Sequence, residues 1–327
     1  MRFYIIFNSR AGTAATLGIT ADILAEKFRA AGLNFALDAN DGRPLDERIG
    51  KGLQSGAGVI VAAGGDGTAT AIASALVETD TSLALLPFGT ANLLARDLGI
   101  PLDVDEAIAT LTEMKPQRID VGEVNGRVFL HKAVIGTFPG IAAAREEMRG
   151  DRTLLGKVRF ARRSIRRIGR ARRMAVEIDL PQSGRRIACV HSVAIANNAY
   201  DEGLGRFFSR QRLDRGTLTL YLLKRLSIVD LTRLAVEMLL GRWRRDYALV
   251  IEDVTAAVIR TWRPEADVMI DGEVERMAMP LSFSIRPRAL CVIAPAIGEP
   301  TEAGSASCKA AETKAADGKA ADAVQQG

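Results

Sequence analysis

The sequence predicts a parallel α/β domain followed by a second domain made mainly of antiparallel β-strands. Up to about residue 117, short apolar runs alternate with stretches of helical spacing, a pattern typical of a doubly wound parallel sheet. Beyond this point strand-like runs follow one another closely, and Asn125-Gly126 and Asp271-Gly272 are hairpin signals. We therefore place a domain boundary near residue 117 and the end of the second domain near residue 298.

Each expected element of the first domain is marked by an apolar run or by an apolar helical face that ends near a glycine. Strands are predicted at 2–7, 34–37, 59–63 and 83–86. Helices are predicted at about 23–31, 45–53, 69–76, 93–98 and 104–111.

The second domain is expected to hold ten strand-like runs and one helix. The runs are 118–124, 127–134, 174–180, 187–196, 217–223, 248–251, 256–261, 268–270, 281–285 and 290–293. The helix covers about 228–240. We expect Leu231, Leu234, Ala235, Met238 and Leu239 to be core positions rather than a lipid-binding surface. The segment 299–327 has almost no large apolar residue, so we expect it to be disordered.

The strongest local signal surrounds Asp66. A short apolar run leads into Gly64-Gly65-Asp66-Gly67-Thr68, and a helical pattern with Thr68 as its expected N-cap follows. Glycines let a ligand approach bare backbone, and N–H groups at a helix start bind phosphate. Asp66 suits a divalent ion shared with phosphates, or a proton taken from a hydroxyl. The alternative is a tight turn with a solvated aspartate.

Three polar, glycine-containing turns follow three predicted strands, and they begin at Asn8, Gly64 and Pro87. Ligands of parallel sheets bind at the carboxyl ends of the strands. One nucleotide site built from all three turns is therefore the simplest interpretation. The spacing differs from that of a P-loop, and no lysine follows the glycines.

Composition narrows the class of protein. The chain is 48% hydrophobic and 25% charged, as a globular protein should be, and its formal net charge is +5. Its three cysteines have no paired or metal-type spacing, which favours a reduced, cytosolic setting. No apolar run is as long as a membrane span, so we expect any membrane contact to be made from the surface.

Three motifs together resemble the diacylglycerol kinase and sphingosine kinase catalytic family, and most of all its soluble bacterial lipid kinases. The motifs are GGDGT at 64–68, PFGTANLLAR at 87–96 and DGE at 271–273. The resemblance covers nearly all of 2–295. It implies an α/β domain of the NAD kinase and lipid kinase type, followed by an antiparallel β-sandwich. It also implies ATP- and Mg²⁺-dependent transfer of phosphate to a lipid hydroxyl.

The resemblance also implies roles for single residues. Asp271 would be the base, and Glu273 would bind metal and phosphate. Asp66 would be a further metal ligand. In relatives the residue matching Asp66 has also been assigned the role of the base, so the choice between the two stays open. A second, structural Mg²⁺ of relatives would involve Asp214, but Arg215 stands where an acid is usual. The implied nucleotide site comprises Asn8, Gly12, Gly64, Gly65, Asp66, Gly67, Thr68, Gly89, Thr90 and Asn92.

A basic amphipathic segment, within an expected helical insertion at about 140–173, indicates a membrane partner. One helical face is apolar, and the other carries Arg159, Arg162, Arg163, Arg166, Arg167 and Arg170. Such a helix suits an anionic membrane surface; the alternative is a solvated face on a packed helix. Nucleic acid is not expected, because aromatic residues are not interleaved apart from Phe160. We expect a cytoplasmic protein bound peripherally to the inner face of the membrane.

Three functions are compatible with these motifs. The first is a membrane-associated kinase for a lipid alcohol, with diacylglycerol or a related lipid as the expected acceptor. The second is an NAD kinase-like nucleotide kinase, which would leave the turn at 89–92 and the arginine face unexplained. The third is a lipid-binding regulatory homologue without turnover. The acceptor lipid stays open, and so does the oligomeric state, although the resemblance suggests homodimers formed through the β domain.

Overall fold

The computed structural model describes residues 1–137, 172–203, 209–225 and 227–295. The predicted basic helix with Arg159 to Arg170 and the predicted disordered segment 299–327 lie outside these residues. Within the described part of the chain, no helix is long and apolar enough to cross a membrane.

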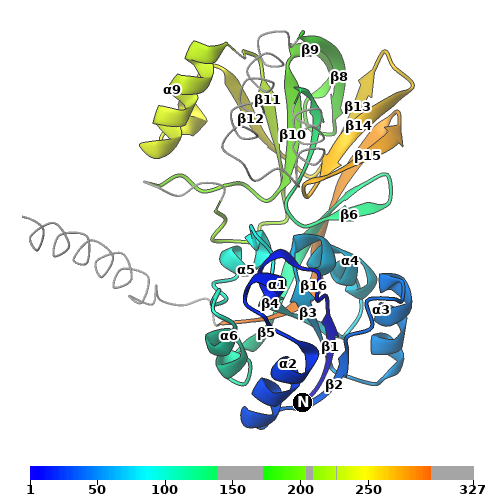
Figure 1. Ribbon diagram of the computed structural model, residues 1–327. Helices are drawn as coiled ribbons and strands as arrows, with labels where there is room; N and C mark the ends of the chain where they lie inside the picture. Colours follow the sequence, from blue (N-terminus) through cyan, green and yellow to red (C-terminus); the bar gives the residue numbers. More distant parts are fainter. Residues whose placement is uncertain (138–171, 204–208, 226, 296–327) are drawn as a thin grey trace, which may run out of the picture. The chain divides into compact units, whose positions relative to one another are not determined.

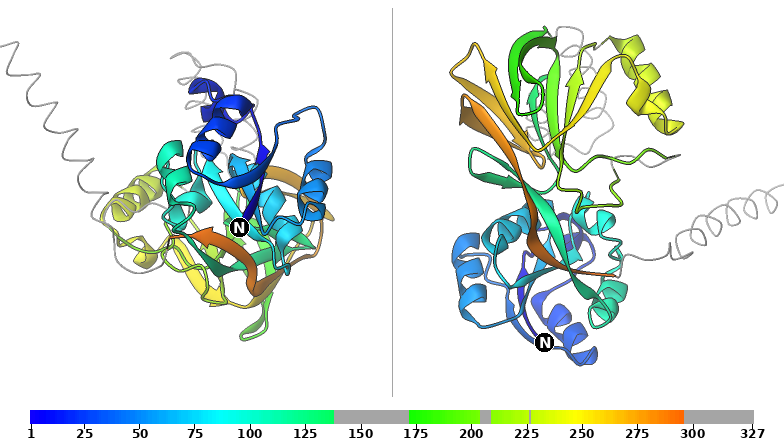
Figure 2. Two further views of the ribbon diagram at one scale, coloured as in Figure 1. Left: turned by 90° about the horizontal axis from the view of Figure 1, so that it is seen from below. Right: turned by 180° about the vertical axis from the view of Figure 1, so that it is seen from behind.

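The first part of the chain alternates strands and helices, as the sequence predicts (Figure 1). The strands are β1 (Arg2–Phe7), β2 (Asn34–Asp38), β3 (Val59–Gly64) and β4 (Ser82–Pro87). The helices are α1 (Gly12–Thr16), α2 (Ala21–Ala30), α3 (Leu45–Gln54), α4 (Asp66–Leu76), α5 (Leu93–Asp97) and α6 (Val104–Thr110). The strands pair in parallel in the order β2-β1-β3-β4. Because helices cover both faces, β3 and β4 are buried along their whole length (Figure 2).

The second part of the chain is mostly antiparallel. Its strands are β5 (Lys115–Val124), β6 (Arg127–Phe129), β7 (Lys132–Gly136), β8 (Met174–Leu180), β9 (Gly184–Val190), β10 (Ser192–Asn197), β11 (Leu218–Leu223), β12 (Leu249–Val254), β13 (Ala256–Thr261), β14 (Glu265–Ile270), β15 (Glu273–Ala278) and β16 (Leu281–Ala294). The helix α9 (Ile228–Leu239) and the short 3₁₀-helix η1 (Trp243–Arg245) lie between β11 and β12.

Two predicted strands are each divided in the structure. The predicted strand 127–134 is interrupted at Leu130 and His131, whose N–H groups donate to the side chain of Asp271 rather than to a neighbouring strand. The predicted strand 187–196 is interrupted at His191, whose N–H donates to the carbonyl of Leu223. Apolar periodicity runs through both breaks, so it could not reveal them.

Two sheets form a sandwich in the second part of the chain. The ten-stranded sheet continues from β4 through β16, β13 and β8 to β9, with β5 on β16 and β6 on β5. The six-stranded sheet has the order β12-β11-β10-β7-β14-β15. Alternate residues of both sheets, such as Leu220 of β11 and Phe283 of β16, meet in one buried apolar cluster. The predicted α/β plus β-sandwich fold is confirmed.

The strands β5 and β16 contribute to two apolar cores. Leu290 and Val292 of β16 pack with the α/β core, whereas Leu281 and Phe283 pack inside the sandwich. The pairing of β5 with β16 shifts register after Arg286, where the strands pass from one core to the other. The domain boundary near residue 117 stays a prediction. The last strand, β16, pairs with β4 and so rejoins the sheet of the first part of the chain.

The start of α4 differs from the prediction. The helix begins at Asp66, with Gly65 in extended conformation as its N-cap, so the expected N-cap at Thr68 was wrong. Thr68 lies buried in the first turn. The chain passes from strand to helix within Gly64 and Gly65, and this leaves no room for a longer turn.

A tight contact in the sandwich yields a prediction for stability. A β-carbon on Gly122 would lie 2.4 Å from two carbons of the Phe129 ring, whereas one on Gly50 in α3 would meet nothing within 4 Å. We expect Gly122→Ala to lower the free energy of unfolding by about 1–3 kcal/mol in urea denaturation. The control Gly50→Ala should be neutral or stabilise by up to about 1 kcal/mol. Equal stability of the two variants would contradict this packing.

Candidate functional site

The three glycine turns meet at the carboxyl ends of β1, β3 and β4. A β-carbon on Gly89 would lie 2.7 Å from the Cα atom of Gly65, so the second and third turns touch through bare backbone. The N–H of Thr13 donates to the carbonyl of Phe88 at 3.0 Å, which joins the first turn to the third. The turns therefore form one continuous surface, as the sequence predicts.

Asn8, Gly12 and Thr90 lie in these contacts between turns. The N–H of Asn8 donates to the carbonyl of Ala63 at 2.9 Å, and its Nδ2 donates to Thr68 Oγ1 at 3.3 Å. A β-carbon on Gly12 would stand 3.4 Å from Thr90 Oγ1. The side chain of Asn8 thus holds two turns together at the predicted nucleotide site.

The carboxylate of Asp66 organises the third turn. Its Oδ1 accepts from the N–H of Leu93 at 2.7 Å, and its Oδ2 accepts from the N–H of Asn92 at 2.9 Å. Asn92, with φ of 48°, folds back so that its side chain bonds both the N–H and the carbonyl of Gly89 at 2.8 Å. Each carboxylate oxygen accepts up to two hydrogen bonds, so Asp66 keeps acceptor sites for a metal or a hydroxyl.

The hairpin between β14 and β15 brings Asp271 and Glu273 to the first turns of α4. The hydroxyl of Thr70 donates a long hydrogen bond of 3.4 Å to Asp271 Oδ2. A β-carbon on Gly67 would lie 2.9 Å from Glu273 Oε1, so this carboxylate lies directly beside the start of the helix. The structure thus places the predicted DGE turn against the predicted GGDGT turn.

Three backbone N–H groups hold the carboxylate of Asp271. Leu130 donates to Oδ2 at 2.7 Å, and His131 and Lys132 both donate to Oδ1 at 2.9 Å. Burial raises the pKa of Asp271, and the three N–H bonds oppose this shift. Oδ1 has both acceptor positions filled. Oδ2 accepts from Leu130 and, over 3.4 Å, from Thr70, so an incoming hydroxyl would find a place there by displacing the Thr70 hydroxyl.

Arg210, in the loop before β11, lies behind this segment and is fully buried. Its Nε and Nη2 donate to Asp97 Oδ2 at 2.9 and 2.7 Å. Its Nη1 donates to the carbonyls of Leu130 and Asn197 at 2.7 and 2.6 Å. The peptide group between Leu130 and His131 therefore accepts from Arg210 through its carbonyl and donates to Asp271 through its N–H. Such chained hydrogen bonds strengthen one another in a low-dielectric interior.

Burial shifts the pKa values of the two other titratable groups beside Arg210. Burial raises the pKa of Asp97, opposed by Arg210, whereas burial and then Arg210 hold the pKa of His131 well below its ordinary value. His131 therefore stays neutral beside the guanidinium, with Nδ1 at 3.1 Å from Arg210 Nη2. No motif marked Arg210 or Asp97, which stand 113 residues apart and make an ion pair that one sequence cannot reveal.

Asp214, the residue expected at a second metal, lies among arginines. Its Oδ1 accepts from Arg212 Nε at 3.1 Å, and Arg288 Nη2 stands 3.9 Å from its Oδ2. The Arg215 side chain bonds to Asp201 at 2.9 Å. A carboxylate between guanidinium groups does not fit a divalent cation, so we assign no metal to Asp214.

Asp66 and Glu273 remain as candidate Mg²⁺ ligands. Across the described residues, no three histidine, cysteine, aspartate or glutamate side chains converge on a common metal site. Mg²⁺ is usually bound through one or two carboxylates, with phosphate oxygens and water completing its shell. Two carboxylates at the phosphate-binding start of a helix fit that donor set.

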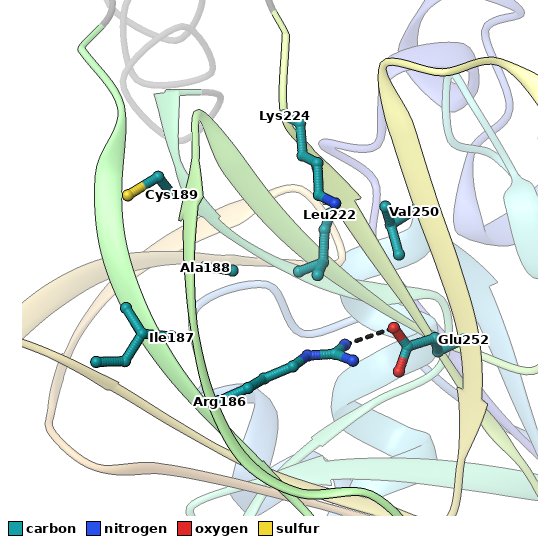
Figure 3. A pocket seen from close by; sticks show the side chains of 8 residues that line it. All are labelled: Arg186, Ile187, Ala188, Cys189, Leu222, Lys224, Val250 and Glu252. Carbon is teal, nitrogen blue, oxygen red and sulfur yellow. Dashed lines mark hydrogen bonds and ion pairs between the residues drawn. The ribbon is translucent and has the colours of Figure 1, made fainter.

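A cavity of about 330 Å³ lies elsewhere, at an edge of the sandwich between β9, β11 and β12 (Figure 3). None of the predicted site residues lines it, and Arg186 and Glu252 form an ion pair across it. The lining residues are Arg186, Ile187, Ala188, Cys189, Leu222, Lys224, Val250 and Glu252.

Comparison with known proteins supports both the fold and the motifs. A crystal structure of a diacylglycerol kinase from Bacillus anthracis str. Sterne superposes with a TM-score of 0.61 at 19% identity. The match covers 91% of this chain and 98% of that chain, and at this identity it shows a shared fold. Residues 2–124 match the family model of the diacylglycerol kinase catalytic domain. Over these residues the chain is similar to the diacylglycerol kinase catalytic domain, which confirms the resemblance for this part of the chain.

Individual relatives match over different lengths. A "Probable lipid kinase YegS-like" of Pseudomonas savastanoi pv. phaseolicola is 46% identical over 101 residues, which are 30% of this chain and 32% of the relative. The chain thus spans about a third of the length of that relative. The diacylglycerol kinase of Bacillus subtilis (strain 168) is 25% identical over 240 residues, which are 72% of this chain and 78% of the relative.

The buried ion pair yields a prediction. Arg210→Met would leave the Asp97 carboxylate buried without its partner, so we expect the free energy of unfolding to fall by about 3–5 kcal/mol in urea. Adding Asp97→Asn should recover part of this loss, because it removes the unpaired charge. The matched control is Arg212→Met, whose side chain is 62% exposed and should cost less than about 1 kcal/mol. Similar losses for Arg210→Met and Arg212→Met would contradict the assigned role.

Proposed function

We propose that this protein is an ATP- and Mg²⁺-dependent lipid kinase, which transfers the γ-phosphate to the hydroxyl of a lipid alcohol, with diacylglycerol or a related lipid as the first candidate. One observation carries the proposal: the DGE hairpin lies against the glycine turns, with Glu273 at Gly67 and Asp271 at Thr70. A phosphate-binding surface and a carboxylate able to receive a proton are thereby brought together. The family match and the names of the relatives support the same activity.

The proposed roles follow from the hydrogen bonds. The glycine turns and the N–H groups at the start of α4 would bind the nucleotide phosphates. Asp66 and Glu273 would hold Mg²⁺, which neutralises charge on the phosphates when bound. Asp271 Oδ2 would orient the acceptor hydroxyl and take its proton. The acceptor oxygen then bonds to the γ-phosphorus as the bond from that phosphorus to the bridging oxygen of ADP breaks.

The geometry favours Asp271 over Asp66 as the base. Both oxygens of Asp66 accept backbone N–H groups of the third turn at 2.7 and 2.9 Å, so changing this carboxylate would also disturb the turn. The long contact between Asp271 Oδ2 and Thr70, by contrast, is one that a substrate hydroxyl could replace. We therefore propose that Asp66 organises phosphate and metal and that Asp271 accepts the proton.

The membrane setting belongs to the same proposal. A lipid acceptor lies in a bilayer, and we propose that the protein reaches it from the cytoplasm at an anionic surface. The sequence from Arg159 to Arg170 supports such contact through its charge pattern.

The test is transfer of radiolabel from γ-³²P-ATP to a panel of lipid alcohols in mixed micelles with Mg²⁺, with NAD as a soluble control. Label in one lipid would support the proposal and name the acceptor. Label only in NADP would replace it by a nucleotide kinase. ATP binding without transfer to any acceptor would favour a regulatory homologue.

Substitution of the proposed base should separate chemistry from binding. We expect Asp271→Asn to lower kcat by about 10²–10⁴-fold, because general base catalysis is lost, while ATP still binds. The matched control is Asp80→Asn on an exposed acid of the α/β domain, which should keep full activity. Wild-type kcat in Asp271→Asn would contradict the proposed role.

The pKa of Asp271 leads to a prediction about pH. The base must be ionised, so kcat/KM should fall as pH falls through its pKa. Because burial raises that pKa, the midpoint of the acid limb should lie above about 3.9, the value for an exposed aspartate. Steady-state rates measured from neutral to acid pH provide the check, and a flat profile down to pH of about 4 would contradict it.

A further inference from the structure

The helix α9 exposes apolar side chains to solvent. Val229 is 75% exposed, Leu239 54% and Leu240 52%, and Val236 is exposed as well. Their spacing of i, i+7, i+10 and i+11 places them on one face of the helix, here called the outer face of α9. The expectation that Leu239 is a core position was therefore wrong, and so was the same expectation for Ala235.

Another side of α9 packs against the protein, and polar contacts hold the helix in place. Leu234 and Met238 pack against a cluster that includes Tyr221 of β11 and Trp243, on the outward side of the six-stranded sheet (Figure 1). Ser227 and Asp230 form a capping box at the N-terminus of the helix. Arg233 donates to both oxygens of Asp246 at 2.8 and 2.7 Å. One apolar side of the helix therefore packs on the protein, and a second apolar side, with Val229, Val236 and Leu239, faces solvent.

Basic and aromatic side chains surround the outer face of α9. Arg225 and Arg242 are exposed near the two ends of the helix. The guanidinium groups of Arg233 and Arg225 stand 3.4 and 4.9 Å from the ring centre of Tyr247, which is itself exposed. An apolar surface bordered by cations and a tyrosine is the pattern of side chains that meet the boundary between lipid headgroups and acyl chains.

We propose that the outer face of α9 is a docking surface for a bilayer that contains anionic lipids. The apolar side chains of this face enter the boundary below the headgroups; they are Val229, Val236, Leu239 and Leu240. The side chains of Arg225 and Arg242 bind the headgroup phosphates. A helix of 12 residues is about 18 Å long, against about 30 Å of hydrocarbon, so it lies along the surface. The exposed arginines at the two ends of the helix favour this occupant over an apolar protein partner. The choice of a membrane as the partner rests on the proposed function, but binding to the membrane does not require kinase activity.

The test is sedimentation of the full chain with vesicles of phosphatidylcholine, with and without phosphatidylglycerol, in the absence of ATP and diacylglycerol. We expect Val236→Ser/Leu240→Ser to lower partitioning onto the anionic vesicles by at least about tenfold, because two apolar side chains no longer leave water. The matched control is Leu53→Ser/Leu102→Ser, which removes two exposed leucines elsewhere and should bind as wild type. Arg225→Gln/Arg242→Gln should weaken binding to the anionic vesicles only, and most at low salt.

Other occupants of the surface give other results. Unchanged vesicle binding by the α9 variants would overturn the inference, as would a lowered Tm without loss of binding, which indicates packing within the protein. A dimer that the α9 variants dissociate in size-exclusion chromatography, with vesicle binding intact, would assign the face to a second copy. Loss of binding on replacing Arg159, Arg162 and Arg163 by glutamine, but not in the α9 variants, would also overturn it.

Failure of this inference can be told from failure of the proposed function. Transfer of phosphate to a short-chain, water-dispersed diacylglycerol measures activity without a bilayer, and the α9 variants should retain it. Vesicle binding that depends on α9, without any kinase activity, would support the docking surface alone. Full kinase activity with vesicle binding independent of α9 would overturn the docking surface alone.

Discussion

The site depends on the ion pair and the hydrogen bonds of the buried guanidinium group of Arg210. This group joins Asp97 at the end of α5 to the carbonyls of Leu130 and Asn197 in the sandwich. A buried ion pair adds little net stability, because both charges lose water, but it strongly disfavours arrangements in which either charge is unpaired. Its effect here is to set the position of the segment from Leu130 to Lys132. That segment in turn presents three N–H groups to Asp271.

The glycine turns supply the other half of the site. The close approach of Gly65 and Gly89 requires residues without side chains. Asp66 then uses its carboxylate to hold the third turn on the second. A surface suited to phosphate results at the edge of a parallel sheet, where such sheets bind ligands. The proposed chemistry needs this surface and the Asp271 carboxylate together, and two separate hydrogen-bond networks bring them there.

Much of this arrangement could be predicted from the sequence, because its signals are local. Glycine turns after β-branched runs predict the sheet edge, and the DGE turn is visible as a hairpin signal. The Asp97–Arg210 pair could not be predicted, since its members lie far apart and each alone resembles a surface residue. The break at Leu130 was missed because the backbone there bonds to a side chain 141 positions away. The sequence predicts Ala235 and Leu239 of α9 in the core, but both are exposed, since helical periodicity shows that a face is apolar but not what covers it.

The central claim is that Asp271 is the proton acceptor in the site. Its most direct test is a ¹³C NMR titration of the Asp271 carboxyl carbon, assigned by comparison with Asp271→Asn, beside the pH dependence of kcat/KM for phosphate transfer. We expect the NMR titration of Asp271 and the acid limb of the rate profile to have the same midpoint. This midpoint should lie above the ordinary pKa of aspartate because the carboxyl is buried. A carboxyl that titrates at a pH clearly different from the acid limb of the rate profile would contradict it.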